Sequence, residues 1–372
     1  MSISSTAKTE PAYSLVDFRG QAEQILDPRI YGFFAGGAGD EVSLRENELA
    51  FSRLKLLPRV LRDLPAIETE VTLFGCRLSM PVIVSPTAFH RLAHPDGERA
   101  TARAVAAAET VMTVSMASTV GIEEIATCAS SPSKPSPGLW FQCYFQPDLG
   151  FTKAVIERAE AAGARALVVT VDSPTFGRRE RDLRLGFTDL PPGLCCENMR
   201  EPQSDGGYGT VREFSFTPRY SWEHVEWLRK ATQLPILLKG ILDPEDARLA
   251  LDYGVQGIFV SNHGGRQLDG VPATIEVLPA IADAVAGRIP ILMDGGIRRG
   301  TDVIKALALG ATAVGIGRPI LWGLAVGGQS GVREVLEILR LELLQALALC
   351  GVASVKQLDR KIIHPPSIGG FL

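Results

Sequence analysis

The sequence predicts a single (β/α)8 TIM barrel of the α/β class, and three observations support this fold. The first is that short apolar runs, rich in β-branched residues, alternate with helix-like segments from about residue 80 onward. Because their apolar residues are consecutive, these runs are typical of strands buried on both faces of a parallel sheet. Eight such runs occur, at residues 82–84, 111–114, 139–141, 166–171, 236–238, 258–260, 291–293 and 313–316.

The second observation is a repeated layout in which a helical segment ends at a glycine and a strand follows. The segment "DPEDARLALDYGVQGIFV" begins with Asp243 as a predicted helix N-cap, and Thr301 has the same predicted role in "GTDVIKALALGATAVGI". The predicted helix-ending glycines are Gly163, Gly254 and Gly310. Such repeats indicate parallel strands joined by right-handed crossovers. The third observation is that no GxGxxG motif follows an early strand, which favours a closed barrel over a Rossmann sheet.

The segments outside the strands predict the domain organisation. We expect a disordered N-terminus and then one domain, in which N-terminal helices and a short ribbon cap the barrel and helices follow it. A long polar loop after the fourth strand is typical of a lid or a disordered segment. The residues are 1–11 for the disordered N-terminus, 12–372 for the domain, about 80–330 for the barrel, 12–75 for the N-terminal helices and ribbon, 185–221 for the loop and 331–360 for the C-terminal helices.

Composition and charge exclude several classes of protein. The 372 residues include 46% hydrophobic residues and carry a formal net charge of -4, so there is no basic excess for binding nucleic acid. The six cysteines form no CxxC pair and no Cys/His spacing suited to zinc, so we expect reduced thiols and no metal site. Neither a signal peptide nor a bilayer-spanning stretch is visible. We therefore expect a cytoplasmic protein with a small-molecule substrate.

Polar residues and glycines follow nearly every predicted strand. In a barrel of this type the C-terminal ends of the strands carry the active site, so these residues converge on one rim. They are Thr87 and Ala88, Ser115, Gln142 and Tyr144, Thr170 and Asp172, Lys239, Ser261 and His263, Asp294 to Gly296, and Gly317 and Arg318. Two acids, a lysine, a histidine and an arginine on one rim indicate a functional site.

The loops after the seventh and eighth strands predict a phosphate site. They supply Gly295 and Gly296, then Gly317 and Arg318, with Arg298 close by in sequence. Barrels commonly bind phosphate at these two loops through backbone N–H groups and arginine. The alternative for any one glycine is a tight turn without a ligand.

His263, in "SNHGGRQLDG", is the candidate base. A lone histidine is more often a structural residue, and we interpret His90, His94, His224 and His364 in that way. His263 differs because two glycines that leave room for a ligand and then Arg266, which is suited to a carboxylate, follow it. Asp172 could orient the imidazole, or it could only cap the next segment. Lys239 could be a structural ion-pair partner. None of these groups performs redox chemistry, so the phosphate site suggests a cofactor.

Six motifs, in order from about residue 13 to 351, resemble the FMN-dependent 2-hydroxy acid oxidase family, which includes glycolate, lactate and hydroxymandelate oxidases and mandelate dehydrogenase. The motifs are "SPTAFHRLAHPDGE", "WFQCYF", "TVDSPTFGRRE", "LKGI", "SNHGGRQLDG" and "DGGIRRGTDVIKALALGATAVGIGRP". The resemblance implies an FMN cofactor. The residues implied for it are Thr87, Ala88, Ser115, Gln142 and Thr170 near the ring, Lys239 at N1 and O2, Ser261, Asp294 and Gly295 along the ribityl side, and Gly296, Arg298, Gly317 and Arg318 at the phosphate.

The resemblance also implies roles in turnover. His263 would be the base with Asp172 as its partner, Arg179 and Arg266 would bind the substrate carboxylate, and Tyr144 would lie beside the substrate oxygen. Two positions depart from the family pattern: Phe33 replaces a tyrosine whose hydroxyl contacts the carboxylate, and Ala117 replaces a tryptophan of glycolate oxidase-like members. Both departures predict a bulky aryl or long-chain 2-hydroxy acid of the (S)/L form.

Oxygen is the expected electron acceptor, giving hydrogen peroxide, because residues 185–221 are too polar to be the membrane-inserting segment of mandelate dehydrogenase-like relatives. The alternatives are a lactate- or glycolate-type oxidase, a dehydrogenase with another acceptor, an FMN-dependent isomerase and a catalytically silent barrel. The resemblance also predicts a homotetramer.

Overall fold

Eight parallel strands close into a barrel in the computed structural model, which describes residues 11–130, 138–203 and 207–364. The strands are β4 (Val82–Val84), β5 (Met112–Ser115), β6 (Leu139–Cys143), β7 (Ala164–Thr170), β10 (Ile236–Ile241), β11 (Gly257–Val260), β12 (Ile291–Met293) and β13 (Ala313–Ile316). β13 pairs with β4, with Val314 opposite Val82, and this pairing closes the sheet. Each strand coincides with one predicted apolar run, so the predicted barrel is confirmed.

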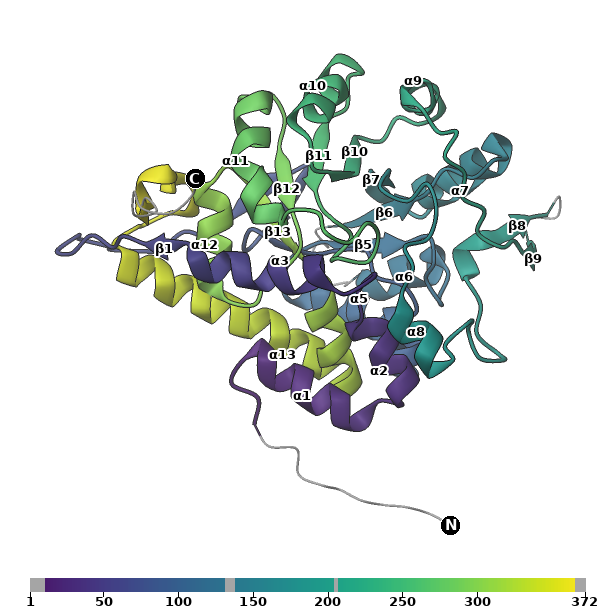
Figure 1. Cartoon of the computed structure of the whole chain (residues 1–372), viewed down its shortest axis with the longest axis horizontal. Coiled ribbons are helices and arrows are strands. Elements are labelled where there is room, and N and C mark those ends of the chain that lie inside the picture. The colour runs from purple at the N-terminus through teal and green to yellow at the C-terminus, as the bar shows by residue number, and fades with distance from the viewer. Residues whose placement is uncertain (1–10, 131–137, 204–206, 365–372) are drawn as a thin grey trace, which may run out of the picture.

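Helices surround the barrel (Figure 1). They are α4 (His90–Ala93), α5 (Gly97–Ala107), α6 (Ile122–Ala129), α7 (Leu149–Ala161), α9 (Trp222–Ala231), α10 (Pro244–Asp252), α11 (Thr274–Val285), α12 (Gly300–Ala308) and α13 (Arg318–Cys350). The cap predicted at Asp243 is confirmed, since its side chain accepts a hydrogen bond from the backbone N–H of Glu245. After α7, α10 and α12, the glycines at 163, 254 and 310 have φ values of 86°, 68° and 115°, which glycine adopts without a Cβ clash.

The cap predicted at Thr301 is wrong. α12 begins one residue earlier, at Gly300, and Thr301 lies inside its first turn. The cap acceptor is Asp302, whose carboxylate accepts hydrogen bonds from the backbone N–H groups of Arg298 and Arg299. A carboxylate in the first helical turn both pairs with free N–H groups and interacts favourably with the helix dipole, which explains why it replaces the hydroxyl.

The barrel interior is filled by side chains, and a ribbon covers its N-terminal end. The ribbon consists of β2 (Val71–Leu73) and β3 (Cys76–Leu78), which pair antiparallel. Leu78 of the ribbon is fully buried with Trp140 and Phe259 from the strands, and Phe74 contacts Trp140 edge-on at 5.5 Å. The predicted capping ribbon is therefore found at the end of the barrel opposite the predicted site.

Three N-terminal helices, α1 (Leu15–Ile25), α2 (Pro28–Ala35) and α3 (Val42–Arg53), pack on the barrel, and α1 lies along the kinked α13 (Figure 1). Beyond α13 come the short 3-10 helices η2 (Val355–Gln357) and η3 (Arg360–Ile362) and strand β14 (Ile363–His364). β14 pairs antiparallel with β1 (Lys55–Leu56), which joins the two ends of the domain. The disorder predicted for residues 1–11 falls almost wholly outside the described residues.

The segment 185–221 is more ordered than its sequence predicts. After α8 (Glu180–Leu185) it forms η1 (Glu197–Met199) and an antiparallel pair of β8 (Arg200–Pro202) and β9 (Tyr208–Val211). Tyr208 donates a hydrogen bond of 2.7 Å to Glu123 on the barrel, and the Arg158 guanidinium lies 3.8 Å from the centre of the Tyr208 ring. These contacts come from residues far apart in sequence, so local composition could not predict them.

In the part of the chain that the structure describes, no helix is both long and apolar enough to cross a membrane. The same residues contain no cluster of three histidines, cysteines or acids suited to a metal ion.

Candidate functional site

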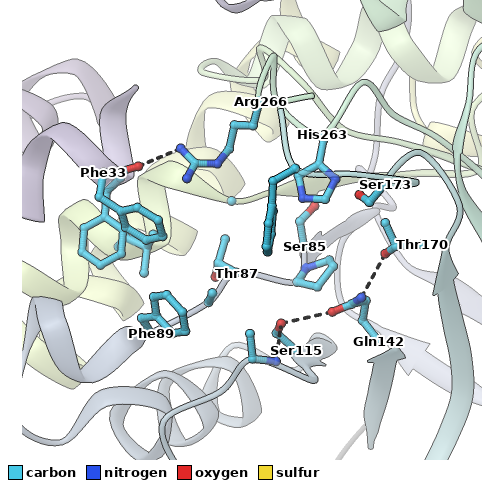
Figure 2. A pocket seen from close by; sticks show the side chains of 18 of the residues that line it. Phe33, Ser85, Thr87, Phe89, Ser115, Gln142, Thr170, Ser173, His263 and Arg266 are labelled. Atoms are coloured by element: carbon cyan, nitrogen blue, oxygen red, sulfur yellow. Dashed lines mark hydrogen bonds between the residues drawn. The ribbon is translucent and has the colours of Figure 1, made fainter. Parts of the chain in front are cut away.

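A cavity of about 760 Å³ opens at the C-terminal ends of the barrel strands. Of the site residues predicted from the sequence, all line this cavity except Asp172 and Ser261, which lie directly behind His263 and Lys239. Residues from the N-terminal helices and from the segment 185–221 complete its walls. The convergence expected from the strand ends is therefore present (Figure 2).

His263 and Asp172 form a hydrogen-bonded pair at the rim. Asp172 follows β7 and His263 follows β11, and His263 Nδ1 lies 2.9 Å from Asp172 Oδ1. Burial raises the pKa of the Asp172 carboxyl, but the attraction of His263 and Lys239 outweighs burial and leaves this pKa below its ordinary value. Asp172 is thus an anion near neutral pH that orients the imidazole and leaves Nε2 for a ligand.

Lys239 lies on the cavity wall, held by groups behind it. Its Nζ donates to Ser261 Oγ at 2.8 Å and lies 3.5 Å from Asp294 Oδ2. The hydroxyl of Ser261 donates to the other Asp294 oxygen at 2.6 Å. Lys239 is 3% exposed, so this network fixes a buried positive charge at one position in the cavity.

Ser85 is a member of this network that sequence reasoning missed. Its hydroxyl donates to Asp294 Oδ2 at 2.9 Å. Ser85 directly follows β4, so the rule that polar residues at strand ends face the site could have identified it.

Three polar side chains form one wall of the cavity. Ser115 donates to Gln142 at 3.1 Å, and Gln142 donates to Thr170 at 3.0 Å (Figure 2). All three side chains are buried, and they present amide and hydroxyl groups to the cavity. Thr87, across the cavity, is hydrogen-bonded to the buried His90 at 2.7 Å, and burial lowers the pKa of His90, consistent with its structural role.

Arg179 and Arg266 bring two guanidinium groups to one side of the cavity. Arg266 donates to the backbone carbonyls of Phe33 and Gly36 at 2.7 and 2.9 Å, and Arg179 pairs with Asp182 at 3.3 Å. Burial lowers the pKa of Arg266 well below its usual value, and the nearby positive charge of Arg179 lowers it further. Two like charges in a buried position attract an anion such as a carboxylate.

Tyr144 lies in the same cavity. Burial, and then the charge of Asp172, raises the pKa of its phenol, so Tyr144 stays a neutral hydroxyl near neutral pH.

A second pair of arginines, Arg298 and Arg318, lies at the loops after β12 and β13. Burial lowers the pKa of Arg318 to about 10, and the charge of Arg298 adds to this shift. Among the described residues, Arg298 Nε is buried without a hydrogen-bond acceptor. Beside it Gly296 has a φ of 87°, and a Cβ there would lie 1.8 Å from the Asn47 carbonyl oxygen. The pair is suited to a dianionic group that reaches the backbone closely.

Aromatic side chains form the largest part of the site that sequence reasoning missed. The Phe33 ring stacks between Phe89 and Phe187, with centroids 5.5 and 4.6 Å away. Phe214 and Phe216 flank Tyr144 edge-on. Phe187, Phe214 and Phe216 belong to the segment interpreted as a lid, where aromatic residues in a polar stretch were the available signal.

Comparison with known proteins identifies the family. A model of the FMN-dependent dehydrogenase family matches residues 22–365. The chain is 46% identical to an L-lactate oxidase from Nostoc sp., over 96% of this chain and 100% of the relative, and 44% identical to glycolate oxidase 1 from Oryza sativa subsp. indica, over 94% and 95%. A crystal structure of mandelate oxidase with (S)-2-phenylpropionate superimposes with a TM-score of 0.86 at 45% identity, over 95% of this chain and 98% of that one. The chain belongs to the FMN-dependent dehydrogenase family.

Proposed function

We propose that this protein is an FMN-dependent oxidase of (S)-2-hydroxy acids with a bulky aryl or long-chain side group, which it converts to 2-oxo acids. The observation that carries the proposal is that one cavity holds the His263–Asp172 pair together with the buried guanidinium groups of Arg179 and Arg266. A base and a carboxylate site within one cavity are what this reaction requires.

The residues of the cavity fit FMN. Arg298 with its unpaired Nε, Arg318 and the close approach at Gly296 suit the phosphate, and the amide and hydroxyl wall suits a polar heterocycle. Lys239 supplies a positive charge about which electron density on the ring is stabilised. When bound, FMN supplies the acceptor for the two electrons that leave the substrate.

The substrate carboxylate binds Arg179 and Arg266, with the Tyr144 hydroxyl nearby. A bidentate pairing of a carboxylate with guanidinium fixes orientation as well as position. Because these charges are buried, the carboxylate also relieves their repulsion.

His263 accepts the proton that leaves the substrate, and its Nε2 is the accepting atom because Asp172 holds Nδ1. The anionic Asp172 stabilises the resulting imidazolium. A base in position contributes roughly 10² to 10⁴ in rate. The proton comes either from the α-carbon or from the hydroxyl, and both options remain compatible with this arrangement.

The size of the substrate follows from Phe33 and Ala117. Phe33 offers no hydroxyl to the carboxylate, and Ala117 is a small residue on the wall. The Phe33, Phe89 and Phe187 rings make an apolar surface beside the arginines, which favours a large apolar side group. The structural similarity to mandelate oxidase, solved with (S)-2-phenylpropionate and with benzoyl-formic acid, supports this choice. A lactate- or glycolate-type oxidase is the second candidate, favoured by the sequence relatives.

Oxygen is the proposed electron acceptor and hydrogen peroxide the second product, as the names of the oxidase relatives favour. A homotetramer and a cytoplasmic location stay predictions from the sequence.

The decisive test is to add glycolate, lactate, (S)-mandelate and 2-hydroxyoctanoate to the purified yellow protein without oxygen. Bleaching of the flavin absorbance by mandelate or 2-hydroxyoctanoate at lower concentrations than by glycolate supports the proposal, and the reverse order contradicts the substrate class. Mixing the bleached protein with air and assaying peroxide then distinguishes an oxidase from a dehydrogenase. Bleaching by none of the acids favours an isomerase or a silent barrel.

A further inference from the structure

Two buried asparagines from distant parts of the chain form a reciprocal amide pair beside the candidate base. Asn47 Nδ2 donates to Asn262 Oδ1, and Asn262 Nδ2 donates to Asn47 Oδ1, both at 2.8 Å. Asn47 is on α3 and is 2% exposed, and Asn262 directly precedes His263 and is 4% exposed. Because turning either amide would leave buried polar groups unpaired, each side chain fixes the orientation of the other.

Asn262 also holds the turn that carries His263. The Gly265 N–H donates to the backbone carbonyl of Asn262 at 2.9 Å and to its side-chain Oδ1 at 3.2 Å. Within this turn His263 has a φ of 57°, a left-handed conformation that persists in a non-glycine residue only where surrounding contacts support it. The Asn262 amide is one of those contacts, and Asn47 sets its orientation.

The geometry of the turn determines where the imidazole lies. The 2.9 Å hydrogen bond between His263 and Asp172 joins the turn to the end of β7, so a small rotation of the turn would break it. Asn47 neither lines the cavity nor contacts His263 directly. Any effect it has on the base must therefore pass through Asn262.

We propose that Asn47 is a positioning residue for His263, acting through the amide of Asn262. This inference rests on the proposed role of His263 as the base. It makes the N-terminal helix α3 a determinant of active-site geometry as well as a cover for the barrel.

The test uses the FMN-loaded protein with Asn47→Ala and with Asn47→Asp. Asn47→Ala should retain FMN, because the contact with the Gly296 loop comes from the backbone carbonyl of Asn47, which the substitution keeps. We expect at least a tenfold lower rate constant for anaerobic flavin reduction at saturating substrate, with little change in substrate affinity. We also expect a changed titration of the His263 imidazole by NMR in the absence of substrate. Ser52→Ala is the matched control, since Ser52 lies on the same helix and donates only to the exposed Leu49 carbonyl.

The variants Asn262→Ala and Asn47→Ala/Asn262→Ala complete a double-mutant cycle. The double variant should be no slower than Asn262→Ala alone, whereas multiplied losses would contradict an action through Asn262. An unchanged rate and an unchanged His263 titration in Asn47→Ala would overturn the proposal.

If Asn47→Ala does not fold, Asn47→Asp decides. Its carboxylate still accepts from Asn262 Nδ2 but cannot donate to Oδ1, so the same losses are expected, and a wild-type rate and titration would overturn the proposal. Because the NMR titration needs no substrate, it tests the coupling to His263 even if the wild-type protein oxidises no 2-hydroxy acid. That latter result would overturn the proposed function instead.

Discussion

The Arg266 guanidinium is attached to Phe33 in two ways. Its Nη1 donates to the Phe33 carbonyl at 2.7 Å, and its central carbon lies 4.9 Å from the centre of the Phe33 ring (Figure 2). Arg179 lies 5.6 Å from the same ring. Phe33 therefore orients both arginines of the proposed carboxylate site through its backbone and its π-face, although it has no hydroxyl.

Phe33→Tyr should improve turnover of small substrates. A hydroxyl added beside Arg179 and Arg266 can donate to the substrate carboxylate, and such a bond is worth about 1.5 to 3 kcal/mol. We expect kcat/KM for glycolate and lactate to rise about 10- to 100-fold. Steady-state kinetics with both acids provide the measurement. Phe33→Leu is the control, because it removes the ring without adding a hydroxyl and should lower turnover of every substrate.

Ala117→Trp should narrow the cavity. The indole would occupy space on the wall now left by the methyl group, so large side groups would clash while small ones would still fit. We expect kcat/KM for mandelate and 2-hydroxyoctanoate to fall by about 100-fold, equivalent to about 2.7 kcal/mol, and that for glycolate to change little. Equal losses for all four acids would show that the substitution disturbs the site as a whole.

Asp172→Asn should remove a charge that matters for activity and for stability. Without the anion the imidazolium of His263 loses its partner, and we expect kcat to fall at least about tenfold. The pKa of Asp172 is lowered in the folded protein, so its stabilising contribution is present above the unfolded pKa of about 3.9 and is lost as the pH falls through the folded value. The stability deficit of Asp172→Asn should thus be constant from about pH 8 to 5 and shrink below about pH 4. Urea denaturation at each pH measures it, and a deficit that grows on acidification would contradict this assignment.

Arg318→Lys should weaken FMN binding in a pH-dependent way. Lysine lacks the planar fork that binds phosphate oxygens, so we expect the Kd of the apoprotein for FMN to rise at least about tenfold. The burial that lowers the pKa of Arg318 to about 10 would lower the pKa of a lysine ammonium there as well. The variant should therefore lose affinity between pH 7 and 9, where wild type keeps its charge. Quenching of FMN fluorescence gives both Kd values, and Arg299→Lys, at a half-exposed pair with Glu342, is the control.

The parts of the site that follow the strands were accessible from the sequence. A parallel strand buried on both faces has an apolar run as its signature, and the residue after that run must lie at the rim of a barrel. This relation predicted His263, Asp172 and Lys239 and would also have predicted Ser85. It failed for Thr301, because whether a hydroxyl or a nearby carboxylate caps a helix depends on which side chain reaches the free N–H groups.

The sequence by itself determined the eight strands, the helix and glycine units between them and the set of polar residues at the rim, because these features arise from local periodicity. Only the tertiary structure decided which distant groups meet. Asn47 and Asn262 are 215 residues apart, and Phe187 reaches Phe33 from a segment that looked like an irregular lid. Such pairs form when closure of the barrel brings separate segments together, and their energies depend on distances that no local pattern encodes.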